Sequence, residues 1–137
     1  MDRLDFDKYA IQLAKTASLR SEDPHRQVGA VALNQSKKVV GIAYNGVPSG
    51  FEMPTELLND RDKKRPYMLH AEMNLCSLFK YGEVETVAVT CFPCRYCFIN
   101  LISHGVKRVI YEESYTDPET LDIASFYKDV IQLDQIV

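Results

Sequence analysis

A short cysteine-containing stretch, Pro93-Cys94-Arg95-Tyr96-Cys97, constrains what this chain can fold into more than any other feature. Two cysteines three positions apart on the first turn of a helix point in the same direction, so both sulfur atoms can bind one ion. Proline is tolerated at the first helical position, and the positive end of the helix dipole favours the thiolates that a metal requires. The stretch therefore predicts a helix that begins at a metal site.

A second motif, His70-Ala71-Glu72, lies upstream and supplies a third metal ligand and a carboxylate, which the cysteine pair lacks. Zinc binds thiolate sulfur and imidazole nitrogen tetrahedrally, and three protein ligands leave the fourth position for water, as in catalytic zinc sites. The predicted ligands are therefore His70, Cys94 and Cys97. Glu72 is not needed to bind the metal and is placed to move protons as a general acid and base.

A closed structural site is the alternative for the same residues. Cys91, Cys94 and Cys97 form C-x-x-C-x-x-C, and with His70 they could complete a Cys₃His zinc site. The spacing also resembles an iron–sulfur cluster run, but such a run needs a fourth cysteine. Cys91 ends an expected strand and the chain then turns, so we expect its sulfur to pack elsewhere and favour the open catalytic site.

The remaining cysteine and histidines are expected to serve the fold. Cys76 lies among apolar residues of an expected helix and is assigned to the core. His25 and His104 are isolated histidines, for which surface or hydrogen-bonding roles are expected.

Length and charge limit the class of protein. A chain of 137 residues with 46% hydrophobic and 26% charged residues is typical of one globular domain, which buries about two thirds of its unfolded surface. The net charge of −3 argues against an extended basic surface for nucleic acid. No apolar run approaches the roughly 18 residues of a membrane helix, and the charged start does not resemble a signal peptide. We therefore expect a cytoplasmic protein, with no nucleic-acid or membrane partner, whose cysteines are ligands or free thiols.

The pattern of apolar residues and turn formers predicts the order α-β-β-α-β-α-β-α-β. A hairpin followed by strand–helix–strand crossovers gives a mixed sheet with helices on both faces. Both ligand segments begin helices, so two helix N-termini can meet at one zinc beside the sheet. The expected helices span residues 5–20, 70–81, 94–104 and 119–128, and the expected strands span 28–33, 39–44, 86–91, 106–111 and 130–137.

Of two further segments, one is a candidate ligand-binding loop and the other a surface insertion. Residues 45–50 are rich in turn formers and are a candidate ligand loop. Residues 51–66 are irregular and charged, so we expect a solvated surface insertion, with the alternative that some of its basic side chains meet a phosphate. In the helix after this insertion, the side chains expected to be buried are Met73, Cys76, Leu78 and Phe79.

Five blocks of the sequence together resemble deoxycytidylate (dCMP) deaminases, within the cytidine deaminase-like superfamily. Between Ser21 and Asp117 they read S-E-D-P-H-R-Q-V-G-A-V, G-I-A-Y-N-G-V-P-S-G, Y-M-L-H-A-E-M-N, F-P-C-R-Y-C and S-Y-T-D. The H-x-E…P-C-x-x-C pair is shared by zinc nucleobase deaminases in general. The Y-N-G-x-P-x-G loop and the S-x-D-P segment narrow the resemblance to dCMP deaminases.

The resemblance implies a three-layer α/β/α cytidine deaminase-like fold with a five-stranded mixed sheet, forming a single zinc-dependent deaminase domain over residues 1–137. It implies hydrolytic deamination of dCMP to dUMP plus ammonia, which supplies dUMP for thymidylate synthesis. Glu72 would shuttle protons beside one zinc ion. The residues implied to meet the substrate are Asn45 at the sugar or base, Ala71 through its amide, Pro93 through its carbonyl, Arg26 at the phosphate and Tyr115 as a gate.

The resemblance also concerns partners. Relatives are often hexamers activated by dCTP and inhibited by dTTP, so a homo-oligomer, with a hexamer favoured, is implied, and Mg²⁺ could accompany a nucleotide effector. Residues 49–69 hold no cysteine or histidine, so the second, structural zinc of some relatives is not expected. Two alternatives stay open: a deaminase of another small cytosine nucleoside or nucleotide, and a non-catalytic nucleotide-binding zinc module. The presence of Glu72 argues against the module.

Overall fold

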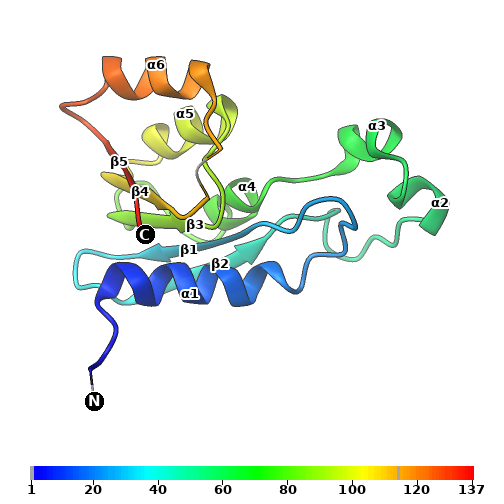
Figure 1. The fold of residues 1–137 in the computed structure, drawn as a ribbon, viewed down its shortest axis with the longest axis horizontal. Coiled ribbons are helices and arrows are strands. Elements are labelled where there is room, and N and C mark those ends of the chain that lie inside the picture. The colour runs from blue at the N-terminus through cyan, green and yellow to red at the C-terminus, as the bar shows by residue number, and fades with distance from the viewer. Residues whose placement is uncertain (1, 114) are drawn as a thin grey trace.

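Each helix and strand expected from the sequence has a counterpart in the computed structural model, which describes residues 2–113 and 115–137 (Figure 1). No helix in these two ranges is both long enough and apolar enough to pass through a membrane. In chain order the elements are α1 (Phe6–Ser18), β1 (Gly29–Leu33), β2 (Val39–Tyr44), α2 (Thr55–Leu58), α3 (Arg61–Lys64), the 3₁₀ turn η1 (Arg65–Tyr67), α4 (Ala71–Cys76), β3 (Thr86–Val89), α5 (Arg95–Ser103), β4 (Arg108–Tyr111), α6 (Pro118–Phe126) and β5 (Gln132–Gln135).

The five strands form one mixed sheet in the order β2-β1-β3-β4-β5. β1 runs antiparallel to both of its neighbours, with Val31 opposite Ile42 on β2 and Ala88 on β3. β3, β4 and β5 are parallel to one another. Every residue of β1 and β3 is buried, as expected for central strands that are covered on both faces. The predicted mixed five-stranded sheet is confirmed.

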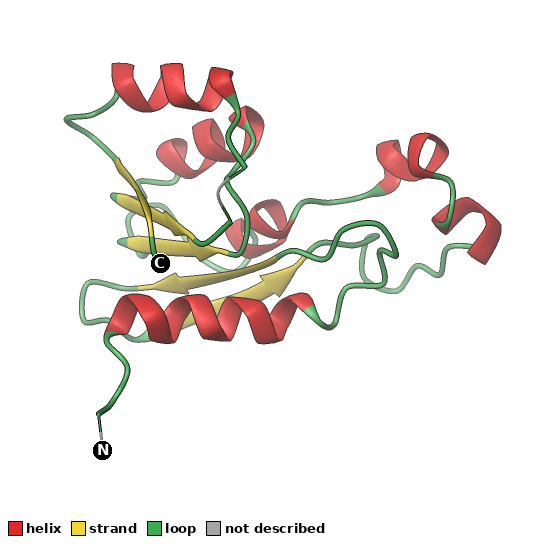
Figure 2. Cartoon of the chain, viewed as in Figure 1, coloured by secondary structure: helices red, strands yellow, loops and turns green. Residues whose placement is uncertain are grey.

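Helices cover the two faces of this sheet unequally, as Figure 2 shows. α1 packs alone against one face, where Ala14 belongs to the same buried cluster as Val31 and Ile110 of the sheet. It approaches β1 closely at Gly29, where an added Cβ would lie 1.8 Å from the carbonyl oxygen of Ala14. The other face carries α4, α5 and α6, with Phe98 fully buried in the larger core. The three-layer α/β/α architecture is therefore confirmed.

The segment between β2 and α4 differs from the prediction. Instead of an irregular loop it contains α2, α3 and η1, and in Figure 1 α2 and α3 project beyond one end of the sheet. Asp60 begins α3, because its side chain accepts a hydrogen bond from the amide of Lys63 at 3.0 Å. We call residues 51–67 the arm.

The helix that follows the arm is shorter than predicted. α4 ends at Cys76, where the Ser77 hydroxyl donates to the carbonyl of Asn74 at 2.7 Å, a local bond that competes with helix continuation. Its buried side chains are Ala71, Glu72, Leu75 and Cys76. Met73 and Leu78 are 46% and 52% exposed, so their predicted burial was wrong. The periodicity assumed a longer helix, whereas only the first turn and a half pack against the sheet.

Arg108 on β4 joins three elements at one edge of the fold. Its two terminal nitrogens donate to the two carboxylate oxygens of Asp7 on α1, each at 2.8 Å, and its Nε donates to Asp134 on β5 at 3.2 Å. Arg108 and Asp7 are only about one quarter exposed. A bidentate arginine–carboxylate pair is stronger than a single ion contact, so this pair fixes α1 to the parallel half of the sheet.

Replacing Asp7 tests this link. Because the variant Asp7→Asn removes the charge from a paired hydrogen bond, we expect the free energy of unfolding to fall by about 1–3 kcal/mol in chemical denaturation. The control is Lys15→Met on the same helix, which breaks the exposed Lys15–Glu112 pair and is expected to cost less than about 1 kcal/mol. Equal losses in the two variants would contradict the assignment.

Candidate active site

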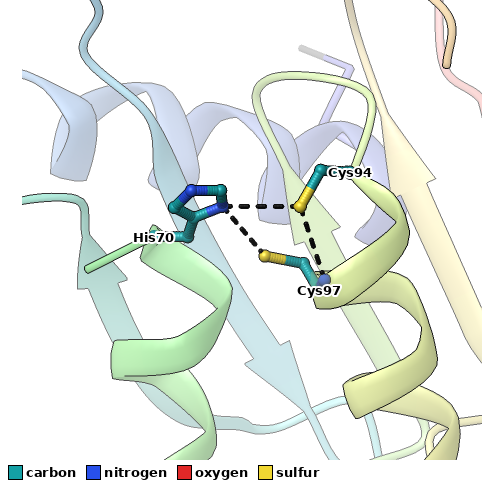
Figure 3. Close-up of side chains that lie close together, drawn as sticks. All are labelled: His70, Cys94 and Cys97. Atoms are coloured by element: carbon teal, nitrogen blue, oxygen red, sulfur yellow. Dashed lines mark hydrogen bonds between the residues drawn. The ribbon is translucent and has the colours of Figure 1, made fainter. Parts of the chain in front are cut away.

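Three side chains from two helix starts meet beside the sheet (Figure 3). The Nδ1 atom of His70 lies 3.2 Å from the sulfur of Cys97 and 3.5 Å from the sulfur of Cys94. All three potential ligand atoms lie within 4.8 Å of one another. The structure therefore brings together the three residues that the sequence predicted as a metal site.

Two helix caps produce this arrangement. His70 is the N-cap of α4 and Cys94 is the N-cap of α5, both with extended backbone. The sulfur of Cys94 accepts a hydrogen bond from the amide of Cys97 at 3.4 Å, which holds the two thiols on one side of the first turn. Since Cys94 is the cap, Pro93 lies one position before it and not at the first helical position, as the sequence had suggested.

The donor set fits a zinc ion with an open position. Tetrahedral zinc with Zn–S of about 2.3 Å and Zn–N of about 2.0–2.1 Å places nitrogen and sulfur ligands about 3.5 Å apart, close to the separations found here. Cys91 does not join the group of three. Its sulfur instead donates to Glu113 Oε2 at 3.4 Å. This placement disfavours the closed Cys₃His alternative and leaves a fourth zinc position for a non-protein ligand.

The two thiols differ in their acidity. Hydrogen bonds from the side chains of Cys97 and His70 outweigh burial and lower the pKa of Cys94 to about 4. The hydrogen bond to Cys94, together with burial, raises the pKa of Cys97. The hydrogen bond to Cys94 also raises the pKa of the His70 ring. Protein groups alone thus support one thiolate, and a divalent cation supplies the charge that favours the second.

Glu72, in the first turn of α4, is the buried carboxyl of this site. Only 4% of its surface is exposed, and it lines the cleft that also reaches His70 and Cys94. Burial raises its pKa, an effect opposed by its own amide and by the charge of His70. A carboxyl with a raised pKa is suited both to accept and to return a proton near neutral pH.

The ligand-sized cleft has a volume of about 560 Å³ and holds most of the residues that the sequence singled out. Its walls combine the metal-site helices, the loops that follow α1 and β2, and the arm. The predicted site residues that line it are Arg26, Asn45, His70, Ala71, Glu72, Cys94 and Tyr115. Cys97 is buried behind this surface, and Pro93 is not part of the lining.

Asn45 fixes the cleft wall through both ends of its amide. Its Oδ1 accepts from the amide of Val28 at 2.9 Å, and its Nδ2 donates to the carbonyl of Arg26 at 2.9 Å. The next residue, Gly46, forms an isolated antiparallel bridge with Leu69, directly before the ligand His70. The candidate ligand loop is therefore tied on one side to Arg26 and on the other to the metal centre.

Arg26 and Tyr115 are brought together in the lining of the cleft. The guanidinium carbon of Arg26 lies 5.6 Å from the centre of the Tyr115 ring, a cation–π distance. A hydrogen bond with Cys91 raises the pKa of Arg26. Ser114, the first residue of the S-Y-T-D block, lies outside the described residues.

The Pro93 carbonyl, which the resemblance assigned to the substrate amine, has a protein partner. The hydroxyl of Thr120 donates to it at 3.0 Å from a fully buried position on α6. A carbonyl oxygen has two lone pairs, so one stays available. A substrate contact of Pro93 stays a prediction.

Sequence reasoning missed the structural part played by the arm. Lys64 is only 3% exposed, and its ammonium group donates to Asp23 at 2.6 Å and contacts Nδ1 of His25. Although burial raises the pKa of Asp23, hydrogen bonds from Lys64 and two backbone amides lower it below its ordinary value. The insertion is thus exposed along most of its length, as expected, but not at Lys64. Arg61, Lys64 and Arg65 all line the cleft, and their i, i+3, i+4 spacing was the available signal.

Other assignments made from sequence agree with the structure. Cys76 is buried, and burial raises the pKa of its thiol to about 11. The Nδ1 atom of His104 lies 2.9 Å from the carbonyl oxygen of Asn100, and its ring packs edge-on against Phe79. His25 has the hydrogen-bonding role expected of it, through its contact with Lys64.

Sequence comparison with known proteins also indicates a zinc-binding deaminase. The model of the family described as cytidine and deoxycytidylate deaminase zinc-binding region matches residues 4–113. Deoxycytidylate deaminase of Pongo abelii is 34% identical over 137 aligned positions, covering 94% of this chain and 77% of the relative. The deoxycytidylate deaminase of Mus musculus is 37% identical over 128 positions, covering 86% of this chain and 71% of the relative.

Solved structures share the fold at lower identity. The dCMP deaminase of the cyanophage S-TIM5, in complex with dCMP and dUMP, superimposes with a TM-score of 0.78 at 20% identity and covers 99% of this chain and 100% of that one. Cytidine deaminase of Mycobacterium tuberculosis gives a TM-score of 0.56 at 18% identity, covering 88% of this chain and 94% of that one. The cytidine deaminase-like fold predicted from the sequence is thus confirmed.

The four cysteines provide a direct test of the metal site. We expect the purified chain to carry one zinc per molecule, and Cys94→Ser or Cys97→Ser to lose it, because each removes one of three protein ligands. Cys91→Ser and Cys76→Ser are the matched controls and are expected to retain zinc. Metal analysis by plasma mass spectrometry measures all five proteins. Zinc loss in Cys91→Ser as complete as in Cys94→Ser would instead establish the closed four-ligand site.

Proposed function

This chain belongs to the cytidine and deoxycytidylate deaminase zinc-binding family, and on that basis we propose that it hydrolyses dCMP to dUMP and ammonia, with Zn²⁺ as cofactor. One observation supports this proposal most strongly: the buried carboxyl of Glu72 lines the same cleft as the ligand residues His70 and Cys94. The relatives named above act on dCMP according to their names, and the resulting dUMP would supply thymidylate synthesis.

The reaction requires controlled proton movement. Water must add at C4 of the cytosine ring, one proton must reach ring N3, and another must reach the departing amine, so that dUMP and NH₃ leave. His70, Cys94 and Cys97 would hold Zn²⁺, which would supply a nucleophile at neutral pH by lowering the pKa of water to about 7. Glu72 takes the proton from the attacking water, delivers it to N3, and passes a second proton to the amine.

Backbone and side-chain groups of the cleft would hold the nucleotide. Ala71 is the first residue of α4, where an amide has no acceptor within the helix, so its N–H can donate to the base carbonyl. Asn45 would contact the sugar or base with the hydrogen-bonding capacity that its two backbone bonds leave free. Tyr115 would close over the substrate as a gate, stacked on Arg26. Pro93 would accept from the amine through its remaining lone pair.

The phosphate of the substrate would be recognised by cations at the outer part of the cleft. Lys64 is already paired with Asp23, and Arg65 lies 3.2 Å from Asp62. Arg61 lines the cleft and, within the described part of the chain, has no carboxylate at ion-pair distance. We therefore assign the phosphate to Arg61 together with Arg26, because guanidinium groups match phosphate oxygens in pairs.

The proposal also covers the cellular location, the oligomeric state and the effectors of this enzyme. Reduced thiols such as Cys94 persist in the cytoplasm, where we place the protein as one deaminase domain spanning residues 1–137. Met73, Leu78 and Tyr81 leave large apolar surfaces exposed on and after α4, which supports a homo-oligomer, with a hexamer favoured. We extend the proposal to activation by dCTP and inhibition by dTTP, with Mg²⁺ accompanying the nucleotide effector.

A glutamine at position 72 separates catalysis from binding. Glu72→Gln keeps the size of the side chain but cannot carry the protons, so we expect the rate of dCMP deamination to fall by at least about 10²-fold. Zinc content, measured on the same samples, is expected to be unchanged. Activity equal to that of the wild-type chain would refute the proton-transfer role, and a wild-type chain inactive on all cytosine substrates would favour the non-catalytic zinc module.

A substrate panel tests the phosphate assignment. Turnover of dCMP, CMP, deoxycytidine and dCTP is followed by ultraviolet absorbance, with and without dCTP or dTTP as effector. We expect dCMP to be strongly preferred, and Arg61→Gln or Arg26→Gln to lower kcat/KM for dCMP by about 10- to 100-fold without affecting deoxycytidine, because a charged hydrogen bond to the phosphate is lost. Lys63→Gln is the control, since Lys63 belongs to α3 but does not line the cleft.

The panel also decides between enzyme classes. Equal or better turnover of deoxycytidine by the wild-type chain would contradict recognition of the phosphate and favour a nucleoside deaminase. If Lys63→Gln lowered kcat/KM for dCMP as much as Arg61→Gln does, the result would show a general effect of charge and not a contact between Arg61 and the phosphate.

A further inference from the structure

α6 has one fully buried side chain, and that side chain is polar. Thr120 is the only buried residue of this nine-residue helix, with 0% of its surface exposed. Ile123 and Ala124 on the same helix are only partly buried against the core. A hydroxyl in such a position is unfavourable unless it forms a hydrogen bond, so its partner identifies what the residue does.

That partner belongs to the metal-binding loop. The Thr120 hydroxyl donates to the carbonyl oxygen of Pro93 at 3.0 Å, across 27 positions of sequence. The Pro93 carbonyl is part of the peptide group that links Pro93 to Cys94. Fixing the plane of this peptide fixes the direction from which Cys94 enters α5, and with it the position of the Cys94 sulfur.

A second contact holds the other side of the same cysteine. Glu119, next to Thr120, lies 3.2 Å from the Nε atom of Arg95, which follows Cys94. Both of these side chains are exposed by more than one third, so the ion pair is the weaker of the two links. The cysteine N-cap is thus flanked on both sides by residues that α6 contacts.

We propose that Thr120 is a positioning residue of the zinc centre: its hydrogen bond to the Pro93 carbonyl holds Cys94 in ligating geometry. The inference rests on the zinc site of the proposed function but concerns a residue outside the region matched by the family model, which ends at residue 113. Groups that orient metal ligands from behind commonly change metal affinity by about 10- to 100-fold when they are removed.

Matched substitutions at position 120 test the hydroxyl itself. Thr120→Val keeps the shape of the side chain and removes the hydroxyl, Thr120→Ala removes it without introducing a new methyl group, and Thr120→Ser retains it. Zinc affinity is measured by competition with a chromophoric chelator, and the coordination of Co²⁺ in place of zinc is followed through its thiolate-to-cobalt and d–d absorption bands. Asp7→Asn, which weakens the distant Asp7–Arg108 pair, is the control for a general loss of stability.

We expect Thr120→Val and Thr120→Ala to bind zinc about 10- to 100-fold more weakly, with altered cobalt bands, whereas Thr120→Ser stays within about threefold of the wild-type chain. Asp7→Asn is expected to lower the unfolding temperature and leave zinc affinity unchanged. If Thr120→Val does not fold, Thr120→Ala and Thr120→Ser provide the comparison.

The inference is overturned if hydroxyl-free variants have wild-type zinc affinity and cobalt spectra, even when they unfold at lower temperature. It is also overturned if Thr120→Ser loses as much zinc affinity as Thr120→Val, because a retained hydroxyl would then fail to preserve the site. A wild-type chain that binds neither metal would overturn the zinc site and this inference with it. Metal binding by the wild-type chain without deamination of dCMP would refute the proposed function while the affinity comparison still decides the role of Thr120.

Discussion

Two helices must begin within a few ångströms of each other for this site to exist, and the sheet imposes that proximity. The backbone of Leu69 is fixed by two hydrogen bonds to Gly46, just beyond the end of β2, and His70 follows directly. Cys94 follows the end of β3. Because β1 runs antiparallel to both β2 and β3, these two strands point the same way, and pairing in the sheet brings both entry points to the same end of the sheet. The coordination geometry is thus a consequence of backbone hydrogen bonds formed elsewhere.

Around this centre, polar groups of the protein are satisfied by one another before any ligand binds. Both ends of the Asn45 amide hold the backbone of the segment containing Arg26, and a carboxylate oxygen of Glu22 accepts from the amide of Val47 at 2.8 Å. The buried Lys64–Asp23 pair anchors the arm in the same way. A cleft organised by such internal bonds needs little rearrangement on binding, which lowers the entropic cost of association and keeps dipoles oriented for the reaction.

The sequence predicted those parts whose signal is local. The H-x-E motif, the cysteine pair of P-C-x-x-C, the β-rich runs of the strands and the helix expected over residues 94–104 each lie within a short window, and each has its counterpart in the structure. The failures involve partners far apart in the chain. The burial of Lys64 depends on Asp23, 41 positions away, and the Pro93 carbonyl is bonded by Thr120, 27 positions away. Periodicity cannot report such pairs. The short α4 is a different case, because the bond from the Ser77 hydroxyl to the Asn74 carbonyl competes locally with continuation of the helix.

The arm has a consequence for how enzymes of this kind can diverge. It contributes no strand to the five-stranded sheet in the part of the chain that the structure describes, and it is anchored to the body by a buried ion pair. Its sequence and length can therefore change while the metal centre is inherited intact. Selection acting on Arg61 and its neighbours could change which phosphorylated compounds bind in the cleft. The catalytic residues and the residues that select the substrate would then evolve separately, because they are encoded in separate stretches of one gene.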